Sequence, residues 1–281
     1  MQILYYSYLS ILWLIFWSFS SVLIYRWYNK KTWILNWRSE CTNCHHKLGF
    51  FDLIPVFSYI FSRWKCRHCK AKISFIYPLL EISMWILFLL SWIYLTNYEL
   101  IISLNYIEIF KLLFFLFVSF VIVTFTFYDI LYMEIPDEIM IPAILIIFSI
   151  LFIISFKSDI GIFNFYKTFD NNILNTPLIN WVLWSLVIFL FFYFQILVSD
   201  WTWMGWWDLR IAIFMWLVAW FKIALLWLML AYFIGSIFWV LIILKTRSRN
   251  TAIPFWPYLW GWLFISLLFY EDIITWYLNI L

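Results

Sequence analysis

The chain has little charge and very little glycine. Charged residues make up 12% of the 281 positions, and there are only 5 glycines. Soluble domains average roughly 25% charged residues and about 7% glycine. Hydrophobic residues account for 67% of the chain, and the mean hydropathy is +0.94. This composition excludes a disordered chain and an ordinary soluble domain, and it predicts a protein that lies in the lipid bilayer.

Long apolar stretches define the expected fold class. A helix needs about 20 apolar residues to cross the hydrocarbon core of a bilayer. The first stretch has no small-residue cleavage site after it, which favours a retained span over a removed signal peptide. The sequence therefore predicts an all-α polytopic membrane protein, with bilayer lipid as a partner and about eight transmembrane helices at 3–25, 77–95, 108–128, 138–156, 178–198, 209–223, 224–244 and 256–276.

The cations predict the orientation. Of 18 Lys and Arg residues, ten lie between Arg26 and Lys72, whereas the loop 96–107 has none. Because cytoplasmic loops are enriched in Lys and Arg, segment 26–76 is expected in the cytoplasm and both chain ends outside. The short loops 129–137 and 199–208 then also face the cytoplasm. Topology accounts for the cations, so the net charge of +3 does not indicate a nucleic-acid partner.

All four cysteines lie in the first polar segment, as two C-x-x-C pairs separated by 21 residues. This spacing is typical of a four-thiolate zinc ribbon, in which each pair forms a tight turn. Disulfides and unpaired buried thiols are the alternatives, and thiols on the cytoplasmic side stay reduced, which argues against disulfides. We expect a closed, structural Zn²⁺ site that folds a small domain with almost no core. Four sulfurs saturate zinc, so His45, His46 and His68 are expected to be solvated or to lie outside the ligand set. The predicted ligands are Cys41, Cys44, Cys66 and Cys69.

Carboxylates near the predicted membrane face are candidates for function, because an ionisable group is costly there. Asp129 ends one predicted span and Asp208 begins another at the same face. Two carboxylates that share a site split their titrations, which is what an aspartic protease requires. The alternative is that Asp208 is a helix cap. The candidates are Glu81, Glu108, Asp129, Glu134, Asp137, Asp200 and Asp208.

Four segments resemble one family, in its order along the chain. They are "RSECTNCHHKLGFFDLIPVFSYIFSRWKCRHCKAKISFIYPLLE" (38–81), "YDILYMEIPDEI" (128–139), "GWWDLR" and "TAIPFWPYL". They resemble the cytoplasmic domain, the two aspartate motifs and the P-F-G-P turn of the bacterial type IV prepilin peptidases, the aspartyl protease family A24. The resemblance extends from about residue 10 to 275.

The resemblance implies a bifunctional enzyme of the bacterial inner membrane. It would cleave the leader of type IV prepilins and pseudopilins at the cytoplasmic face and N-methylate the new N-terminus with S-adenosylmethionine. Asp129 and Asp208 match the catalytic aspartates, and the four cysteines match the zinc ligands. Asp137 belongs to the first motif but not to the catalytic pair, and a helix cap or turn residue is its expected role. The implied division is 1–100, containing the zinc domain 26–76 and associated with methyl transfer, and 105–281, the six-span peptidase domain.

Glu81 is the sequence candidate for methyl transfer, because a lone acid at the start of the second span needs a partner. Arg26 or Arg38 could supply it, and a structural ion pair is the alternative. Three other interpretations of the chain's function stay open. They are an archaeal-type preflagellin peptidase, which generally lacks the double C-x-x-C domain, a catalytically inactive relative, and a non-enzymatic zinc-ribbon membrane scaffold.

Tryptophan stands where the family has glycine. The chain has 22 Trp and 5 Gly, although its abundant Phe, Ile, Asn and Lys suggest an AT-rich gene in which the Trp codon is scarce. We hypothesise that the organism reads a reassigned UGA codon as glycine. Trp at membrane interfaces is the alternative, but it does not explain the family's glycine positions. The affected positions are Trp17, Trp64, Trp85, Trp207, Trp216, Trp220 and Trp256.

Overall fold

The computed structural model describes residues 16, 19–29, 39–134, 136–156, 177–198, 206–219, 221–246 and 256–279, with some side chains inside the helices left undescribed. The chain divides into two compact units, Met1–Leu131 and Tyr132–Leu281. Each is described by itself. Most of the predicted first span (3–25), Arg38 and Asp200 lie outside the described residues.

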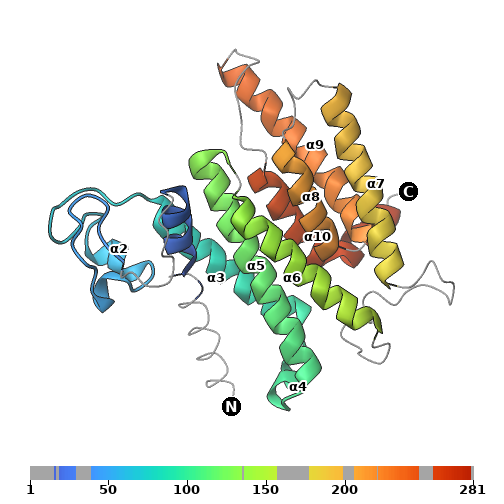
Figure 1. Ribbon diagram of the computed structural model, residues 1–281, viewed down its shortest axis with the longest axis horizontal. Coiled ribbons are helices and arrows are strands. Elements are labelled where there is room, and N and C mark those ends of the chain that lie inside the picture. The colour runs from blue at the N-terminus through green and yellow to red at the C-terminus, as the bar shows by residue number, and fades with distance from the viewer. Residues whose placement is uncertain are drawn as a thin grey trace. The chain divides into compact units, whose positions relative to one another are not determined.

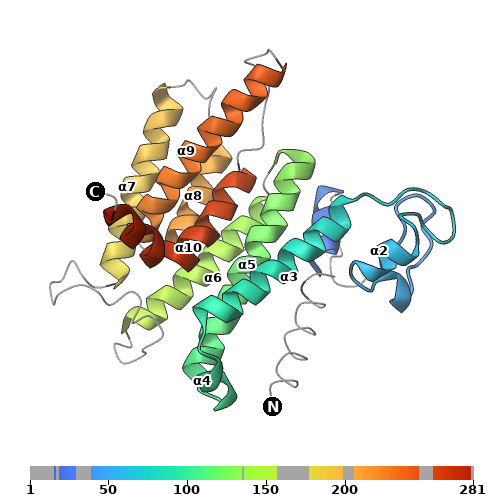
Figure 2. The same cartoon turned by 180° about the vertical axis from the view of Figure 1, so that it is seen from behind.

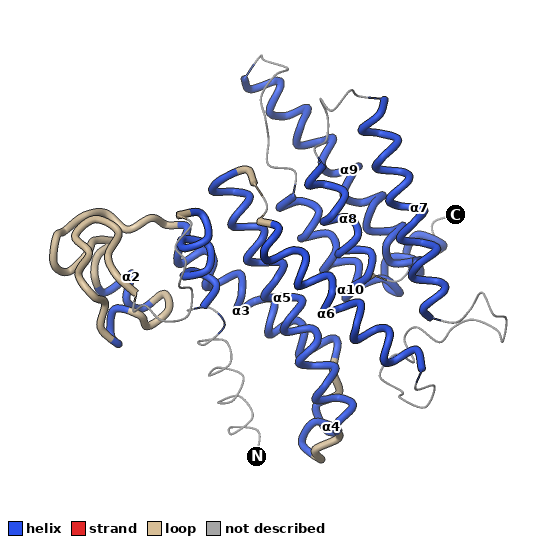
Figure 3. The backbone as a smooth tube through the Cα atoms, in the orientation of Figure 1, coloured by secondary structure: helices blue, strands red, loops and turns tan. Residues whose placement is uncertain are grey.

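The first unit combines long helices with a segment that is mostly loop (Figures 1 and 3). The loop segment, residues 39–75, holds two short helices, and a turn of helix separates the two long ones. Residues 19–28 are also helical. The named elements are η1 (Phe50–Asp52), α2 (Phe57–Phe61), α3 (Ile76–Leu95), α4 (Tyr98–Ile102) and α5 (Tyr106–Tyr132).

Helices α3 and α5 pack closely through small polar residues. The Ser91 and Ser119 hydroxyls lie 3.1 Å apart, and both side chains are fully buried. Small residues let apolar helices approach, and their hydroxyls bond across the interface. The ring of Phe16 contacts Phe88 of α3 and Phe120 of α5, at centroid distances of 5.8 and 5.4 Å. The N-terminal residues therefore help to close this bundle.

The connection between α3 and α5 gives one of the candidate acids, Glu108, a structural role. Asn97 caps α4 by accepting hydrogen bonds from the Glu99 and Leu100 N–H groups. Its own N–H donates to Glu108 at 2.9 Å, and Lys111 lies 3.5 Å from the same carboxylate. Glu108 thus stabilises the turn that joins the two helices.

The second unit is a bundle of the helices α6 (Asp137–Phe156), α7 (Pro177–Val198), α8 (Trp206–Val218), α9 (Phe221–Thr246) and α10 (Trp256–Leu278), seen from both sides in Figures 1 and 2. Helix α8 packs against α6 and α7, and α10 packs against α9. In α8 the side chains from Phe214 to Val218 are all buried. The Tyr232 hydroxyl of α9 donates to Gln195 of α7 at 2.9 Å.

The helical fold class is confirmed, and six of the eight predicted spans coincide largely with helices in the described residues. Two of them, Ile76–Leu95 and Tyr106–Tyr132, are long and apolar enough to cross a bilayer by length and composition. The segment predicted at 209–223 differs, since α8 has 13 residues and a new helix begins at Phe221. At about 1.5 Å per residue such a helix covers roughly 20 Å, less than the ~30 Å hydrocarbon core. In the described part of the chain, strand-like pairing is confined to two isolated antiparallel bridges.

The backbone at Trp64 has a conformation that favours glycine. Its φ is +63°, and the indole is 62% exposed, so no core contact accounts for it. A bulky residue in this left-handed region is uncommon and strained, whereas glycine adopts it freely. The hypothesis of glycine at 64 therefore has support from the backbone. Trp216 differs, because its indole is 1% exposed and fills the core around α8.

The other tryptophans at family glycine positions do not test the glycine hypothesis. Trp85 lies on α3 and is 45% exposed. Trp17 and Trp220 lie outside the described residues, as do the side chains of Trp207 and Trp256.

Candidate functional site

The two C-x-x-C turns have the same backbone geometry. In the first, Cys41 N–H donates to the His46 carbonyl at 3.0 Å, and His45 N–H donates to the Cys41 carbonyl at 2.9 Å. In the second, Cys66 pairs with Ala71 at 2.8 Å and with Lys70 at 3.0 Å, at the same offsets along the chain.

An antiparallel bridge flanks each turn, Glu40 with Lys47 and Lys65 with Lys72. The fifth residue of each turn, His45 or Lys70, has a positive φ, of 54° and 57°. The two C-x-x-C sequences therefore fold into two copies of one knuckle.

The knuckles bring all four thiols together. The four Sγ atoms lie within 4.8 Å of one another, and Cys41 and Cys69 Sγ are 3.8 Å apart. Sulfurs at about 2.3 Å from a tetrahedral zinc are separated by about 3.8 Å, so this set fits the ion. The predicted clustering of Cys41, Cys44, Cys66 and Cys69 is confirmed.

Backbone amides prepare two of these thiols for metal binding. The Ala71 N–H and the Asn43 side chain lower the pKa of Cys69 to about 6. The Cys44 N–H lowers the pKa of Cys41. The His46 N–H acts on Cys44 in the same sense, but desolvation and its cysteine neighbours raise the pKa of that thiol to about 11. Since the thiolate is the ligand, the site gathers groups that a cation would deprotonate together.

The segment that carries the knuckles has almost no core. Between residues 39 and 75 only Pro55 and Cys66 are buried. Asp52 crosses from η1 to the second knuckle, where it lies 3.3 Å from Arg67. The ring centroids of His46 and His68 lie 3.5 Å apart with the two ring planes tilted by 34°, and neither residue belongs to the sulfur cluster. A metal is the group best suited to fold such a segment.

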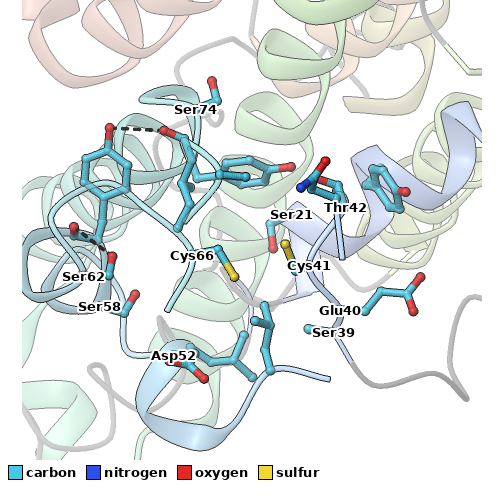
Figure 4. A pocket seen from close by; sticks show the side chains of 18 of the residues that line it. Ser21, Ser39, Glu40, Cys41, Thr42, Asp52, Ser58, Ser62, Cys66 and Ser74 are labelled. Carbon is cyan, nitrogen blue, oxygen red and sulfur yellow. Dashed lines mark hydrogen bonds between the residues drawn. The ribbon is translucent and has the colours of Figure 1, made fainter. Parts of the chain in front are cut away.

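Glu81 joins this segment to the membrane helix. It lies in the second turn of α3, is 4% exposed, and accepts a hydrogen bond from the Val56 N–H next to α2. Val56 is the N-cap residue of α2 and has a φ of +58°. Arg26, on the helical stretch 19–28, is 6% exposed. Both residues line one cavity of about 710 Å³. Figure 4 shows other residues of the cavity wall, among them Cys41 and Cys66.

Asp129 lies in the last turn of α5. Its side chain is only 6% exposed, so this acid is buried among the helices rather than on their surface. Asp208 is the third residue of α8, and its side chain lies outside the described residues. The two residues belong to different units. Their approach to one another therefore stays a prediction from the sequence.

Asp137 and Arg210 form an ion pair that was not predicted. Asp137 begins α6, as expected for a residue that follows Pro136, and its Oδ1 accepts a hydrogen bond from Arg210 Nη1. Arg210 lies two residues after Asp208 in α8. Its observed partner is the other acid of the first motif, 73 residues away, and no spacing rule connects the two positions. The pair links α6 to α8 inside the second unit.

Similarity to known proteins extends over most of the chain. Residues 11–95 match the family model described as the bacterial peptidase A24 N-terminal domain. The chain is similar to bacterial prepilin leader peptidases. It is 28% identical over 249 residues to a prepilin leader peptidase/N-methyltransferase of Aeromonas salmonicida, covering 86% of this chain and 75% of the relative.

Two further relatives carry the same name. An Aeromonas hydrophila protein is 29% identical over 251 residues, with the same coverage. A Vibrio cholerae protein is 38% identical over 95 residues, which cover 31% of this chain and 37% of the relative. No solved structure matches the chain. The resemblance drawn from the motifs is confirmed, and prepilin peptidase relatives account for both the N-terminal domain and most of the remaining length.

Proposed function

We propose that this chain cleaves the leader peptide of type IV prepilins and pseudopilins, with Asp129 and Asp208 as the two catalytic carboxylates. The names of the relatives support the activity. The single observation on the chain that supports the mechanism is the burial of Asp129 at the end of an apolar helix, since a buried acid there is a functional candidate.

The chemistry needs one ionised and one protonated carboxyl. The ionised carboxylate takes a proton from water as that water attacks the scissile carbonyl, and the second carboxyl donates its proton to the carbonyl oxygen. Collapse of the tetrahedral intermediate then breaks the C–N bond and returns a proton to the leaving amine. The first-turn position of Asp208 in α8 supports its ionised form, because a helix N-terminus favours negative charge.

The expected topology places this chemistry at the cytoplasmic face of the bacterial inner membrane. Loops 129–137 and 199–208 and the cation-rich segment 26–76 share that side in an arrangement of about eight spans. Zn²⁺ held by the four cysteines would fold the segment that carries the knuckles and supply no step of the cleavage.

The second proposed activity is N-methylation of the new N-terminus, for which S-adenosylmethionine supplies the methyl group. Glu81 is the candidate residue in the N-terminal domain. It is buried, faces a cavity and is far from Asp129 along the chain.

Cleavage of a type IV prepilin in membranes tests the first proposal. General acid–base groups contribute about 10²–10⁴-fold to rate, so Asp129→Asn and Asp208→Asn should each lose at least 100-fold in cleavage. Glu134→Gln is the matched control, an exposed acid five residues beyond Asp129 that should retain activity. Equal cleavage in all variants would exclude the aspartyl mechanism.

The indole at Trp207 favours a second candidate function, a catalytically inactive relative. The family has glycine beside the second aspartate, and a bulky residue there obstructs a catalytic loop. The chain should therefore be expressed twice, as written and with glycine at 207 and the other family glycine positions. We expect cleavage to be stronger in the glycine version. If both versions insert into the membrane and neither cleaves prepilin, the chain is a catalytically inactive relative.

A further inference from the structure

Helix α2 turns its polar side inward and its apolar side outward. Ser58 and Ser62 line the cavity beside the knuckles, and Figure 4 shows both serines on its wall. Phe57, Ile60 and Phe61 are 59%, 56% and 75% exposed. A helix at the surface of a soluble domain does the opposite, because it buries its apolar face and exposes its polar one. The outer side of α2 is therefore suited to surroundings other than water.

The neighbouring element η1 adds to this apolar surface. Its Phe50 and Phe51 side chains are 79% and 68% exposed, and α2 contacts η1. Phe57 and Phe61 stack with their ring centroids 6.4 Å apart, and Phe50 and Phe51 meet edge to face at 5.8 Å. Exposed apolar patches of this kind mark interaction surfaces. We call Phe50, Phe51, Phe57, Ile60 and Phe61 the apolar patch.

Exposed cations surround the apolar patch in the sequence. The segment 39–75 holds six of them and only two acids, Glu40 and Asp52, of which Asp52 lies 3.3 Å from Arg67. Apolar side chains beside an excess of Lys and Arg are complementary to anionic lipid, where rings enter the interface and cations attract the headgroups. The exposed cations are Lys47, Arg63, Lys65, Arg67, Lys70 and Lys72.

A bilayer surface is also the partner nearest to the patch along the chain. The segment runs directly into α3 at Ile76, and α3 is long and apolar enough to cross a bilayer. Both belong to the first unit. A surface to which a segment is tethered is present at high effective concentration, so weak attraction suffices for contact. A protein partner has no such advantage.

We propose that segment 39–75 docks on an anionic bilayer surface, with the apolar patch in the interfacial layer and the six cations over lipid headgroups. Such faces enter the boundary between headgroups and acyl chains by about 5–10 Å. Docking accounts for the outward apolar side of α2, and it holds the knuckles against the membrane next to the start of α3. The proposal does not depend on the peptidase or methyltransferase activity.

Photo-crosslinking of the full-length protein tests the docking. The protein is reconstituted in vesicles of equal parts phosphatidylglycerol and phosphatidylcholine, with p-benzoylphenylalanine in place of Phe61 or Phe50. This residue keeps an aromatic ring at each position. After illumination, mass spectrometry should show a lipid adduct at both. Tyr59 lines the cavity on the other side of α2, so it is the matched control position and should give little lipid adduct.

The products distinguish lipid from the other possible occupants. A crosslink from positions 61 and 50 to a second copy of the chain, or to added prepilin, in place of lipid would overturn the proposal. Equal lipid adduct at Tyr59 would overturn it as well, because the whole segment would then be in lipid. Metal content is measured for each variant, so that loss of the knuckles is not mistaken for loss of docking.

Removing cations tests the electrostatic part. Each Lys or Arg near an anionic surface contributes roughly fivefold to binding, so Lys47→Gln combined with Lys72→Gln should weaken docking about 25-fold. The yield at position 61 is compared at the salt concentration that halves the wild-type yield. Lys111→Gln is the matched control, a cation paired with Glu108 beyond the far end of α3, and should change nothing. Equal yields in the double variant and the wild type, or in anionic and pure phosphatidylcholine vesicles, would overturn docking on anionic lipid.

Discussion

The knuckle region and the aspartate region differ in how their functional groups are brought together. The four cysteines span 41–69, inside one unit, and each pair is positioned by hydrogen bonds within its own turn. Asp129 and Asp208 belong to different units and to helices that share no local turn. A site built from turns is therefore specified locally, whereas a site built from helix ends depends on how whole helices pack.

Metal removal should produce the largest effect, and it should be confined to the knuckle region. Structural zinc contributes apparent binding energies of about 10–16 kcal/mol in small domains, and residues 39–75 have only Pro55 and Cys66 buried. A strong chelator, or Cys66→Ser, should expose this segment to protease while α5 stays protected. Limited proteolysis with mass spectrometry would measure it. Loss of protection throughout α5 would show that the two regions are not independent.

Replacing Trp64 by glycine should have a smaller effect on stability, and the change should stabilise the protein rather than destabilise it. A non-glycine residue at positive φ costs of order 1–3 kcal/mol. Trp64→Gly should therefore stabilise the knuckle region by about 1 kcal/mol, after allowing for the greater freedom of glycine in the unfolded chain. Trp85→Gly on α3 is the matched control and should destabilise by about 1 kcal/mol, because its backbone is helical. Denaturant midpoints measure both. Destabilisation by both changes would contradict the strain at position 64.

The Asp137–Arg210 pair should show the smallest effect. The two side chains are 34% and 28% exposed, so solvent screening limits their attraction to well under the value for a buried pair. Asp137→Asn and Arg210→Gln should each cost about 0.5–1 kcal/mol. A double-mutant cycle should give a coupling of similar size. Additive costs would show that the α6–α8 packing does not depend on this pair.

The cysteine site could be predicted from sequence because its spacing reports its geometry. Two C-x-x-C pairs fix two turns, and a tetrahedral ion needs four sulfurs, so the clustering follows once the two turns meet. The Asp137–Arg210 pair could not be predicted in this way. It joins the start of α6 to α8 across 73 residues, and only the packing of these helices brings the side chains together.

The short helix α8 shows another limit of sequence reasoning. Its apolar residues continue into those of α9, so hydropathy alone predicts two full spans with a boundary at 223. Helix α8 ends at Val218 and α9 begins at Phe221, and α8 packs against α6 and α7 with most of its described side chains buried. Hydropathy measures the cost of exposing a segment to water and does not distinguish lipid from a protein core.

The sequence by itself determined the helical class, most helix positions, the cysteine cluster and the similarity to prepilin peptidases. Each depends on composition or on residues close together in the chain. Tertiary structure alone decided that Glu81 and Arg26 line one cavity with the knuckles, and that Arg210 pairs with Asp137. These pairings depend on the packing of helices whose apolar faces all satisfy the same pattern, so the pattern does not specify which polar groups meet.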